Sequence, residues 1–375
     1  MLRFFLKPIV FCLFIIPGLS TVAFSKTLLV SQIPGEGVFS SISGASTQAE
    51  AGDTVFVEEG VYHERVVLKN GVTIQGAGTG LTRIEYSGKG PVVYGKNIKD
   101  GALENLSLTY RGEEKKSIIY LVSSTVAINQ VVLFGGSLSG VEARGDSRVE
   151  IKGAVVKGNK GSGIFLYKGA KGYVEDSQIV GNRYFGIEVK SGALLSARNI
   201  LVNENQAGGV NLMKDASLEL HGSQIFENAN YGVLINKGSS GKIVNNNILG
   251  NSRAGILVFS GGVSVIQNNI ISYNGTGIRI HGEQLPFLSH NNVWNNGLAY
   301  ENMKKPETDI SLDPMFDSSY RLKRGSPMIG KGFWGQDIGA FPFDGGAAPV
   351  EPPSEKASPV IAREKREARP EGAVS

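Results

Sequence analysis

A pair made of glycine and an aliphatic residue recurs at a fixed interval through the middle of the chain. The interval is 23 residues five times and then 22. The pairs are Gly140-Val141, Gly163-Ile164, Gly186-Ile187, Gly209-Val210, Gly232-Val233, Gly255-Ile256 and Gly277-Ile278. A fixed short period indicates a solenoid, because each repeat can bury its apolar face only by stacking on its neighbours.

The pattern inside one repeat indicates which solenoid to expect. After each glycine, apolar residues alternate with variable ones, as in Ile187-Glu188-Val189-Lys190. This period of two is typical of a strand with one buried face. A further apolar residue, such as Ile179 or Val202, precedes each repeat's conserved-register asparagine by three positions and indicates a second short strand. No repeat has room for a helix, so we predict a parallel β-helix.

An asparagine recurs in the same register in every regular repeat. The series is Asn159, Asn182, Asn205, Asn228, Asn251 and Asn274, followed by Asn296 after 22 residues. Asparagine tolerates left-handed backbone, and its amide can bond the next turn of the stack. We therefore expect a structural ladder of amides along one edge of the solenoid.

These repeats resemble those of the pectin-lyase-like superfamily, whose fold is the right-handed parallel β-helix. Residues 51–57 and 71–76 resemble the family's opening coils, and residues 313–341 resemble its closing segment. The resemblance covers roughly residues 38–343 and implies an all-β solenoid of about 10–11 coils, mostly of 23 residues. A short helix within 37–49, with Val38, Ile42 and Ala45 on one face, is expected to cap the first coil.

The chain is predicted to have three parts. Residues 1–25 read as a secretory signal peptide, because a positive start precedes an apolar run and a small-x-small site. Residues 26–343 form the β-helix domain, with regular repeats at 137–296 and a closing segment at 297–343. Residues 344–375 are rich in Pro, Ala and charge, and we expect a disordered tail there. The closing segment should pack Phe316, Leu322, Ile329, Trp334, Ile338 and Phe341 over the end of the solenoid.

Charge and cysteine content narrow the partners. The chain has 38 Lys and Arg against 34 Asp and Glu, which provides no basic field of the kind that nucleic acid requires. Its single cysteine, Cys12, lies in the predicted signal. The four histidines, His63, His221, His281 and His290, share no repeat register, so no metal site or cofactor is predicted. We expect an exported protein, periplasmic or secreted, without stable membrane insertion after signal cleavage.

The outward positions of the regular strand are the candidate functional surface. They form two columns, because coils of a β-helix stack about 4.8 Å apart. Arg144, Tyr167, Glu188 and Lys190 lie within three consecutive coils and are the predicted catalytic residues. Rings suit the apolar faces of sugars, and charges suit their hydroxyls and carboxylates. Further predicted contacts with a glycan are Phe165, Asn211, Asn236, Phe259, Arg279 and His281. Loops near 110–116 or 297–312 are expected to wall the groove.

The resemblance implies action on polysaccharide, since related enzymes usually carry the substrate cleft on this strand face. A lyase or epimerase of an acidic glycan is one hypothesis: Lys190 or Tyr167 abstracts a proton, Arg144 neutralises a uronic carboxylate, and Glu188 holds Lys190 or serves as acid or base. The superfamily's acidic calcium cluster, paired aspartates and Asp-Pro-His-Asp motif are absent here. The alternative is therefore a non-catalytic β-helix that binds glycan or cell-envelope components.

Overall fold

The computed structural model describes residues 25–259 and 264–345. The predicted signal peptide, except Ser25, and most of the predicted tail lie outside these residues. Residues 1–343 belong to one compact unit and 344–375 to another. Apart from one short α-helix and one 3-10 turn, the regular structure of the described residues is strand. None of the helices in the described residues is long and apolar enough to cross a membrane.

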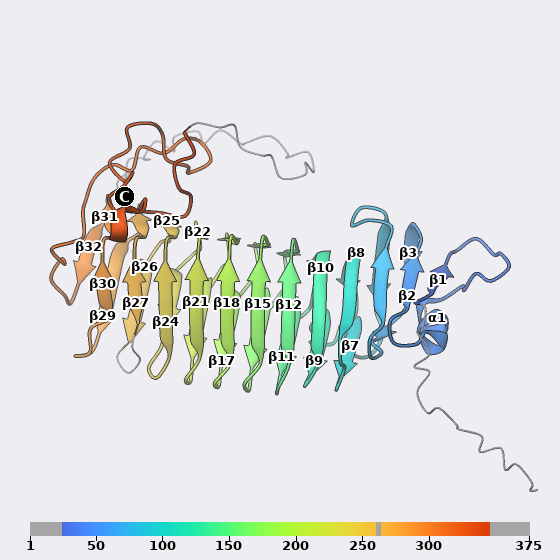
Figure 1. Ribbon diagram of the computed structural model, residues 1–375. Coiled ribbons are helices and arrows are strands. Elements are labelled where there is room, and N and C mark those ends of the chain that lie inside the picture. Colours follow the sequence, from blue (N-terminus) through green and yellow to red (C-terminus); the bar gives the residue numbers. More distant parts are fainter. Residues whose placement is uncertain (1–24, 260–263, 346–375) are drawn as a thin grey trace, which may run out of the picture. The chain divides into compact units, whose positions relative to one another are not determined.

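Parallel strands pair coil upon coil to form two sheets, which we call sheet A and sheet B, and the coils stand side by side in Figure 1. Sheet B has 11 strands, one from each coil. They are β4 (Val66–Val67), β7 (Val93–Lys96), β9 (Ile119–Val122), β11 (Val141–Arg144), β14 (Ile164–Tyr167), β17 (Phe185–Lys190), β20 (Gly208–Met213), β23 (Tyr231–Ile235), β26 (Ala254–Phe259), β29 (Thr276–His281) and β32 (Leu298–Glu301). The predicted parallel β-helix is confirmed.

Sheet A has 21 strands in two limbs, because each coil bends sharply between two of its strands. The first limb contains β1 (Thr27–Val30), β2 (Thr54–Val57), β5 (Thr73–Gly76), β8 (Gly101–Tyr110), β10 (Thr125–Phe134), β12 (Arg148–Lys152), β15 (Lys171–Glu175), β18 (Leu194–Arg198), β21 (Ser217–His221), β24 (Ser240–Val244), β27 (Val265–Gln267) and β30 (Phe287–Ser289). The long strands β8 and β10 run through the bend into the second limb. The bend residue has positive φ, as at Asn105, Asp176 and Asn245, a backbone region that asparagine and aspartate adopt more readily than most side chains.

The second limb of sheet A completes each coil. It contains the C-terminal halves of β8 and β10, followed along the chain by shorter strands. These are β3 (Gly60–Tyr62), β6 (Thr82–Tyr86), β13 (Val155–Lys157), β16 (Gln178–Val180), β19 (Leu201–Asn203), β22 (Gln224–Phe226), β25 (Asn247–Leu249), β28 (Ile270–Ser272) and β31 (Asn292–Trp294).

The core is a set of aliphatic columns that run through the coils. The predicted inward column of sheet B is confirmed, since each of its members is fully buried and pairs with the next. The column consists of Val141, Ile164, Ile187, Val210, Val233, Ile256 and Ile278. Burial of such side chains is the main favourable term for a chain that has no cysteine after Cys12.

The asparagine ladder is confirmed as well. The side-chain amide of Asn205 donates to the Oδ1 atom of Asn228 at 3.0 Å, and Asn182 makes the same bond to Asn205. The backbone N–H of each ladder residue also donates to the next Oδ1 atom. The ladder residues Asn159 to Asn274 are at most 3% exposed, so these bonds satisfy polar groups that water cannot reach.

The first coil is capped as predicted, although the helix is shorter than expected. Helix α1 (Ile42–Gln48) begins after Ser41, whose side chain accepts a hydrogen bond from the backbone N–H of Gly44. Ile42 and Ala45 of this helix are fully buried. The capping helix therefore covers apolar surface that the first coil would otherwise expose.

The C-terminal region differs from the prediction in two respects. Residues 297–312 were expected to be a polar loop, but β32 pairs with β29 and Ile310 pairs with Asn292. This segment therefore makes another turn of the solenoid. Its Tyr300 takes the place of Ile278 in the next coil and donates to buried Asp309 at 2.9 Å.

The closing segment, which we define as residues 313–343, lies against the side of the C-terminal coils. In Figure 1 this red segment runs beside β22, β25 and β31. Leu322, Met328 and Ile338 pack on Leu249 and Ile270 of the second limb. Trp334, predicted to be part of this closure, is instead 87% exposed. The 3-10 turn η1 (Phe333–Gly335) presents it to solvent.

Candidate functional site

The outer face of sheet B places the four predicted catalytic residues side by side. Arg144 of β11 pairs in register with Tyr167 of β14, which in turn pairs with Lys190 of β17. Glu188 lies on the same face in the neighbouring column, opposite Phe165. All five side chains are half-buried. The sequence pattern therefore identified a real cluster, and its catalytic role stays a prediction.

An aromatic and cationic row continues this face toward the N-terminal coils. The rings of Tyr94 and Tyr120 stack with centres 6.2 Å apart. The guanidinium carbon of Arg144 lies 5.0 Å from the centre of the Tyr120 ring, and that of Arg65 lies 5.3 Å from the centre of the Tyr94 ring. Within the described residues, the buried Nε atom of Arg65 has no hydrogen-bond partner. Sequence reasoning missed Arg65, Tyr94 and Tyr120.

A second aromatic pair lies on the next coil. Phe165 and Tyr167 stack with ring centres 5.8 Å apart, and the Lys168 ammonium lies 5.3 Å from the centre of the Tyr167 ring. Such contacts between a cation and a ring are worth about 0.5–1 kcal/mol at exposed sites. The face thus combines flat apolar rings with positive charge over five consecutive coils.

Glu188 is the carboxylate at the centre of this face. Its Oε2 atom accepts a hydrogen bond from the Ser162 hydroxyl at 3.1 Å. Desolvation by burial raises the pKa of Glu188, while the Ser162 hydrogen bond and the charge of Lys190 act in the opposite direction. The sequence hypothesis had Glu188 holding Lys190, but the hydrogen-bond partner in the structure is Ser162. A carboxyl group with a raised pKa is suited to general acid or base chemistry.

The remaining predicted glycan contacts lie farther along the same face and are engaged with one another. Asn211 is buried and accepts a hydrogen bond from Asn236 at 2.8 Å. Phe259 and His281 stack with ring centres 5.0 Å apart. Arg279 donates from Nε to Glu301 at 2.5 Å. These residues form a separate half of the face, in which internal contacts hold most of the polar groups.

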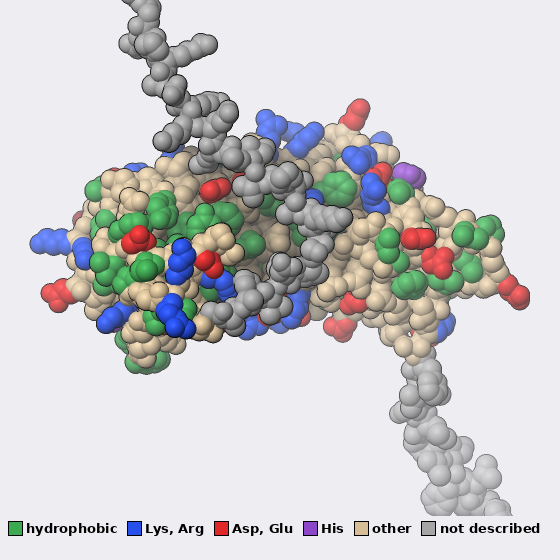
Figure 2. Space-filling view, turned by 90° about the horizontal axis from the view of Figure 1, so that it is seen from above, with side chains coloured by type: hydrophobic (Ala, Val, Ile, Leu, Met, Phe, Trp, Pro, Cys, Tyr) green, Lys and Arg blue, Asp and Glu red, His purple; other side chains and the backbone are tan. Residues whose placement is uncertain are grey.

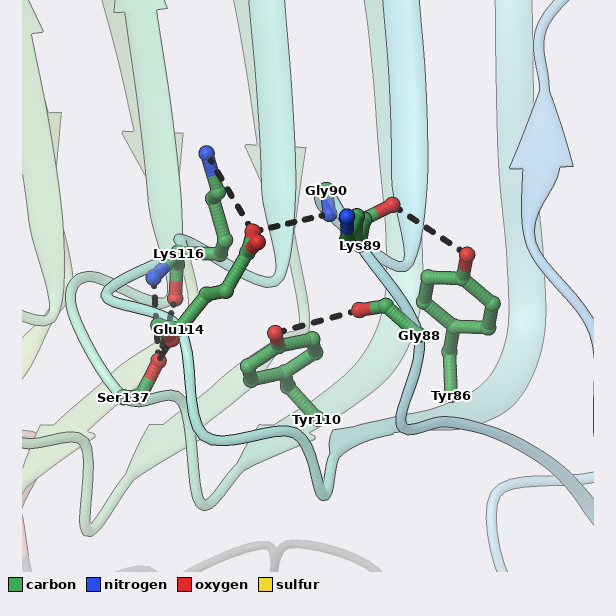
Figure 3. A network of polar contacts seen from close by, with 8 residues as sticks. All are labelled: Tyr86, Gly88, Lys89, Gly90, Tyr110, Glu114, Lys116 and Ser137. Atoms are coloured by element: carbon green, nitrogen blue, oxygen red, sulfur yellow. Dashed lines mark hydrogen bonds and ion pairs between the residues drawn. The ribbon is translucent and has the colours of Figure 1, made fainter.

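The loop predicted near 110–116 is present beside the start of β9, and neighbouring loops hold it in place (Figure 3). The backbone N–H of Gly90 donates to the Glu114 carboxylate at 3.4 Å, and the Lys116 ammonium lies 3.6 Å from the same carboxylate. Ser137 donates from its hydroxyl to the carbonyl of Glu114 and accepts from the backbone N–H of Lys116. The second predicted wall, 297–312, is instead part of the solenoid. The groove over Arg144 and Lys190 stays a prediction.

A hollow of about 400 Å³ lies on the outer face of the other sheet, lined by the first limb of sheet A from Asn129 to His221. Sequence reasoning did not consider this face, because the repeat pattern is weaker there. Within the described residues, no group of three or more His, Cys, Asp or Glu side chains is arranged to hold a metal ion.

Comparison with solved structures agrees with the fold. The Azotobacter vinelandii mannuronan C-5 epimerase AlgE6 A-module aligns with a TM-score of 0.54 at 15% identity, covering 72% of this chain and 93% of that one. Pectate lyase Pel9A aligns with a TM-score of 0.53 at 14% identity, covering 86% and 97%. The enzymatically active domain of bacteriophage CBA120 tailspike protein 2 aligns at 0.51 and 12%, covering 64% and 43%. At these identities the likeness shows the fold alone.

The sequence itself matches a known family. No curated protein sequence matches this chain. The family described as "Right handed beta helix region" matches residues 61–194 and 139–296, together more than half of the chain. The expected pectin-lyase-like fold is thereby confirmed, and the chain belongs to the family of right-handed β-helix proteins.

Proposed function

We propose that this protein binds an acidic polysaccharide along the outer face of sheet B. The observation that carries the proposal is the row in which rings and cations alternate in register, from Arg65 and Tyr94 through Tyr120 and Arg144 to Tyr167. Aromatic rings stack on the apolar faces of sugars, and guanidinium and ammonium groups bond carboxylates strongly.

The spacing of this row fits a polymer. Coils repeat about every 4.8 Å, so the strands from β7 to β17 span about 19 Å, the length of several sugar units. A row of separate contacts along one direction favours an extended chain over a small compact ligand. The printed names of similar structures, a mannuronan epimerase and a pectate lyase, support a uronate polymer as the ligand class.

Chemistry on the bound polymer is the finer part of the proposal. Arg144 would neutralise a uronate carboxylate, which makes the neighbouring carbon-bound proton easier to remove. Lys190 or Tyr167 would take that proton, and Glu188 would protonate the departing glycosidic oxygen. The result is chain cleavage with an unsaturated sugar end, as in a lyase; return of a proton to the opposite face would be epimerisation. The raised pKa of Glu188 supports its role as the acid.

A non-catalytic glycan- or envelope-binding protein is the second candidate. The observation in its favour is that Arg144 and Tyr167 already contact aromatic or cationic neighbours. Groups held in this way bind a ligand with little loss of side-chain entropy. In either case the protein would act outside the cytoplasm, as the signal-like residues 1–25 suggest.

Incubation with polygalacturonate and polymannuronate separates these candidates. Release of product that absorbs as an unsaturated uronate, abolished in Lys190→Ala and retained in Lys157→Ala, would establish the lyase. Lys157 is a matched control because it is an exposed strand lysine on the second limb of sheet A. Binding without turnover or epimerisation, weakened by Tyr167→Ala and not by Tyr273→Ala, would establish the binding protein. Absence of binding to either polymer would refute both candidates.

A further inference from the structure

The outer face of the first limb of sheet A carries a hollow that the proposed function does not use. It extends over β12, β15, β18 and β21, with a volume of about 400 Å³. Ser196 of β18 pairs in register with Tyr173 on one side and Glu219 on the other. The hollow exists because a small side chain lies between two large ones on strands about 4.8 Å apart.

Charged side chains on the N-terminal side of the hollow pair with one another. Arg148 binds Glu150 at 2.8 Å, and its guanidinium carbon lies 4.0 Å from the centre of the Tyr173 ring. Glu175 accepts from Arg198 at 2.6 Å and lies 3.7 Å from the Lys152 ammonium. Because these charges compensate locally, this side offers little net attraction to an anionic ligand.

Polar groups at the other side of the hollow are unoccupied. Within the described residues, the side chains of Ser196, Glu219 and His221 make no hydrogen bond or ion pair. Desolvation, together with the charges of Arg198 and Lys242, lowers the pKa of His221. Its neutral imidazole can then donate one hydrogen bond and accept another near pH 7. These three groups form a mixed set of donors and acceptors.

The closing segment extends this hollow toward the C-terminal coils. A second hollow of about 340 Å³ shares His221 and lies against Gln336, Asp337 and Pro342. This wall is held in place, because Asn245 donates to the carbonyl of Asp337 at 3.1 Å, and the Asp337 side chain accepts from the backbone N–H groups of Gly330 and Phe343. The two hollows therefore form one groove, which we call the sheet A groove.

An exposed tryptophan adjoins the residues that line this groove. Trp334 precedes Gly335 and Gln336 of the second hollow, is 87% exposed and has φ 57°. This backbone region is unfavourable for a bulky residue, and such strain often accompanies a functional role. Asn268 holds the turn by accepting from the backbone N–H of Phe333 at 2.8 Å. Hydrophobic side chains gather among scattered charges over these C-terminal coils, as Figure 2 shows.

We propose that the sheet A groove is a second binding site, for a neutral saccharide chain. Hydroxyl groups both donate and accept, which matches Ser196, Glu219 and His221 better than a carboxylate would. The Tyr173 ring and Trp334 provide aromatic surface for stacking. This site and the face of sheet B are separate surfaces, so each proposal can fail without the other.

Calorimetric titration of the whole chain with cellohexaose, mannohexaose and hexagalacturonate tests the proposal. The neutral hexasaccharide that binds should lose about ten-fold in affinity in Tyr173→Ala and in Ser196→Trp, which fills the hollow. Tyr184→Ala is the control, because Tyr184 is an exposed tyrosine outside the groove. Trp334→Gly should weaken the same binding without lowering the melting temperature, since glycine adopts positive φ freely.

Two results would overturn the proposal. One is the absence of heat with both neutral hexasaccharides at ligand concentrations up to about 10 mM, the weak end of specific binding. The other is neutral binding that Tyr173→Ala and Ser196→Trp both leave unchanged. If Ser196→Trp lowers the melting temperature, Glu219→Gln replaces it, since Glu219 is exposed and makes no contact that supports the fold.

Discussion

The outer faces of sheet B and of the first limb of sheet A are built on the same parallel strands but present different chemistry. On sheet B, the cations Arg65, Arg144 and Lys168 lie over or beside aromatic rings. On sheet A, Arg148 and Arg198 pair with Glu150 and Glu175. The first arrangement leaves positive charge available to a ligand, and the second neutralises it.

This difference teaches that a β-helix separates its frame from its surfaces. The inward residues and the asparagine ladder fix the strand positions, while the outward residues of every coil are free to vary. Two faces of one solenoid can therefore favour ligands of opposite character, an acidic glycan on sheet B and a neutral one in the sheet A groove. The following predictions either break this distinction or sharpen it.

Charge reversal on one face should produce the largest effect. The double substitution Arg144→Glu and Lys190→Glu should weaken hexagalacturonate binding by about a hundred-fold, because two charge-assisted contacts become repulsive. Neutral hexasaccharide binding should stay within a factor of two in the same calorimetric titration. The matched variant reverses Arg148 and Lys152 on sheet A. If it weakens hexagalacturonate binding as much, the two faces are not distinct.

The frame beneath both faces should respond to a single ladder substitution. Asn205→Leu removes the acceptor of two bonds from Asn182 and should cost about 1–3 kcal/mol in free energy of unfolding, because buried polar groups lose their partners. Urea unfolding measures this cost. Asn203→Leu is the control, because Asn203 is half-buried and outside the ladder. An unchanged unfolding midpoint in Asn205→Leu would mean that the ladder contributes nothing to stability.

The regular coils could be predicted from the sequence because their period is constant. A constant period of 23 residues fixes which residue lies above which, so the inward column and the cluster of Arg144, Tyr167, Glu188 and Lys190 follow directly. Hydrogen bonds between side chains, such as Ser162 with Glu188, could not be predicted, because they join residues on different strands through side-chain rotamers.

The N-terminal coils could not be predicted because loops of unequal length interrupt the period. Sequence reasoning placed coil starts at Val72, Val92 and Ile118, whereas sheet B aligns Val66, Val93 and Ile119 with Val141. A shift of one residue exchanges the inward and outward faces of a strand. The shift from Val92 to Val93 is the reason that Tyr94 and Tyr120 were missed.

The closing segment exposed a second limit of sequence reasoning. Its apolar residues were correctly expected to pack, but the surface that receives them was not. The carboxamides of Asn247 and Asn268 bond the backbone of this segment and hold it against the side of the coils. Their spacing matches that of other turn asparagines, so the sequence contains no sign of this docking role.

Salt should affect the two proposed ligands differently. Raising ionic strength from about 50 to 500 mM should weaken hexagalacturonate binding by about ten-fold, because salt screens the contacts of Arg144 and Lys190 with carboxylates. Binding of a neutral hexasaccharide in the sheet A groove should change by less than about two-fold, since its contacts carry no net charge. Equal salt dependence for both ligands would place them on one surface.

The smallest expected effect concerns Glu188 and the pH dependence of stability. Burial raises the pKa of Glu188 above its value in the unfolded chain, so the folded state holds this proton more tightly. The protonated form therefore favours folding at low pH, and this advantage is lost as pH rises from the unfolded pKa through the folded one. Glu188→Gln removes the charge that is costly to bury, and its amide can still accept from Ser162.

The variant should therefore melt at a higher temperature than the wild type at pH 7, and this gain should shrink toward pH 4. Glu142→Gln is the matched control, because Glu142 lies on the same face and accepts from Ser117 at 2.7 Å. An equal, pH-dependent gain in the control would mean that any carboxylate on sheet B behaves in this way. A gain confined to Glu188 would mark one carboxyl group of this face as set apart by burial, as the proposed acid requires, and no comparable raised pKa has a place in the sheet A groove, where binding alone is proposed.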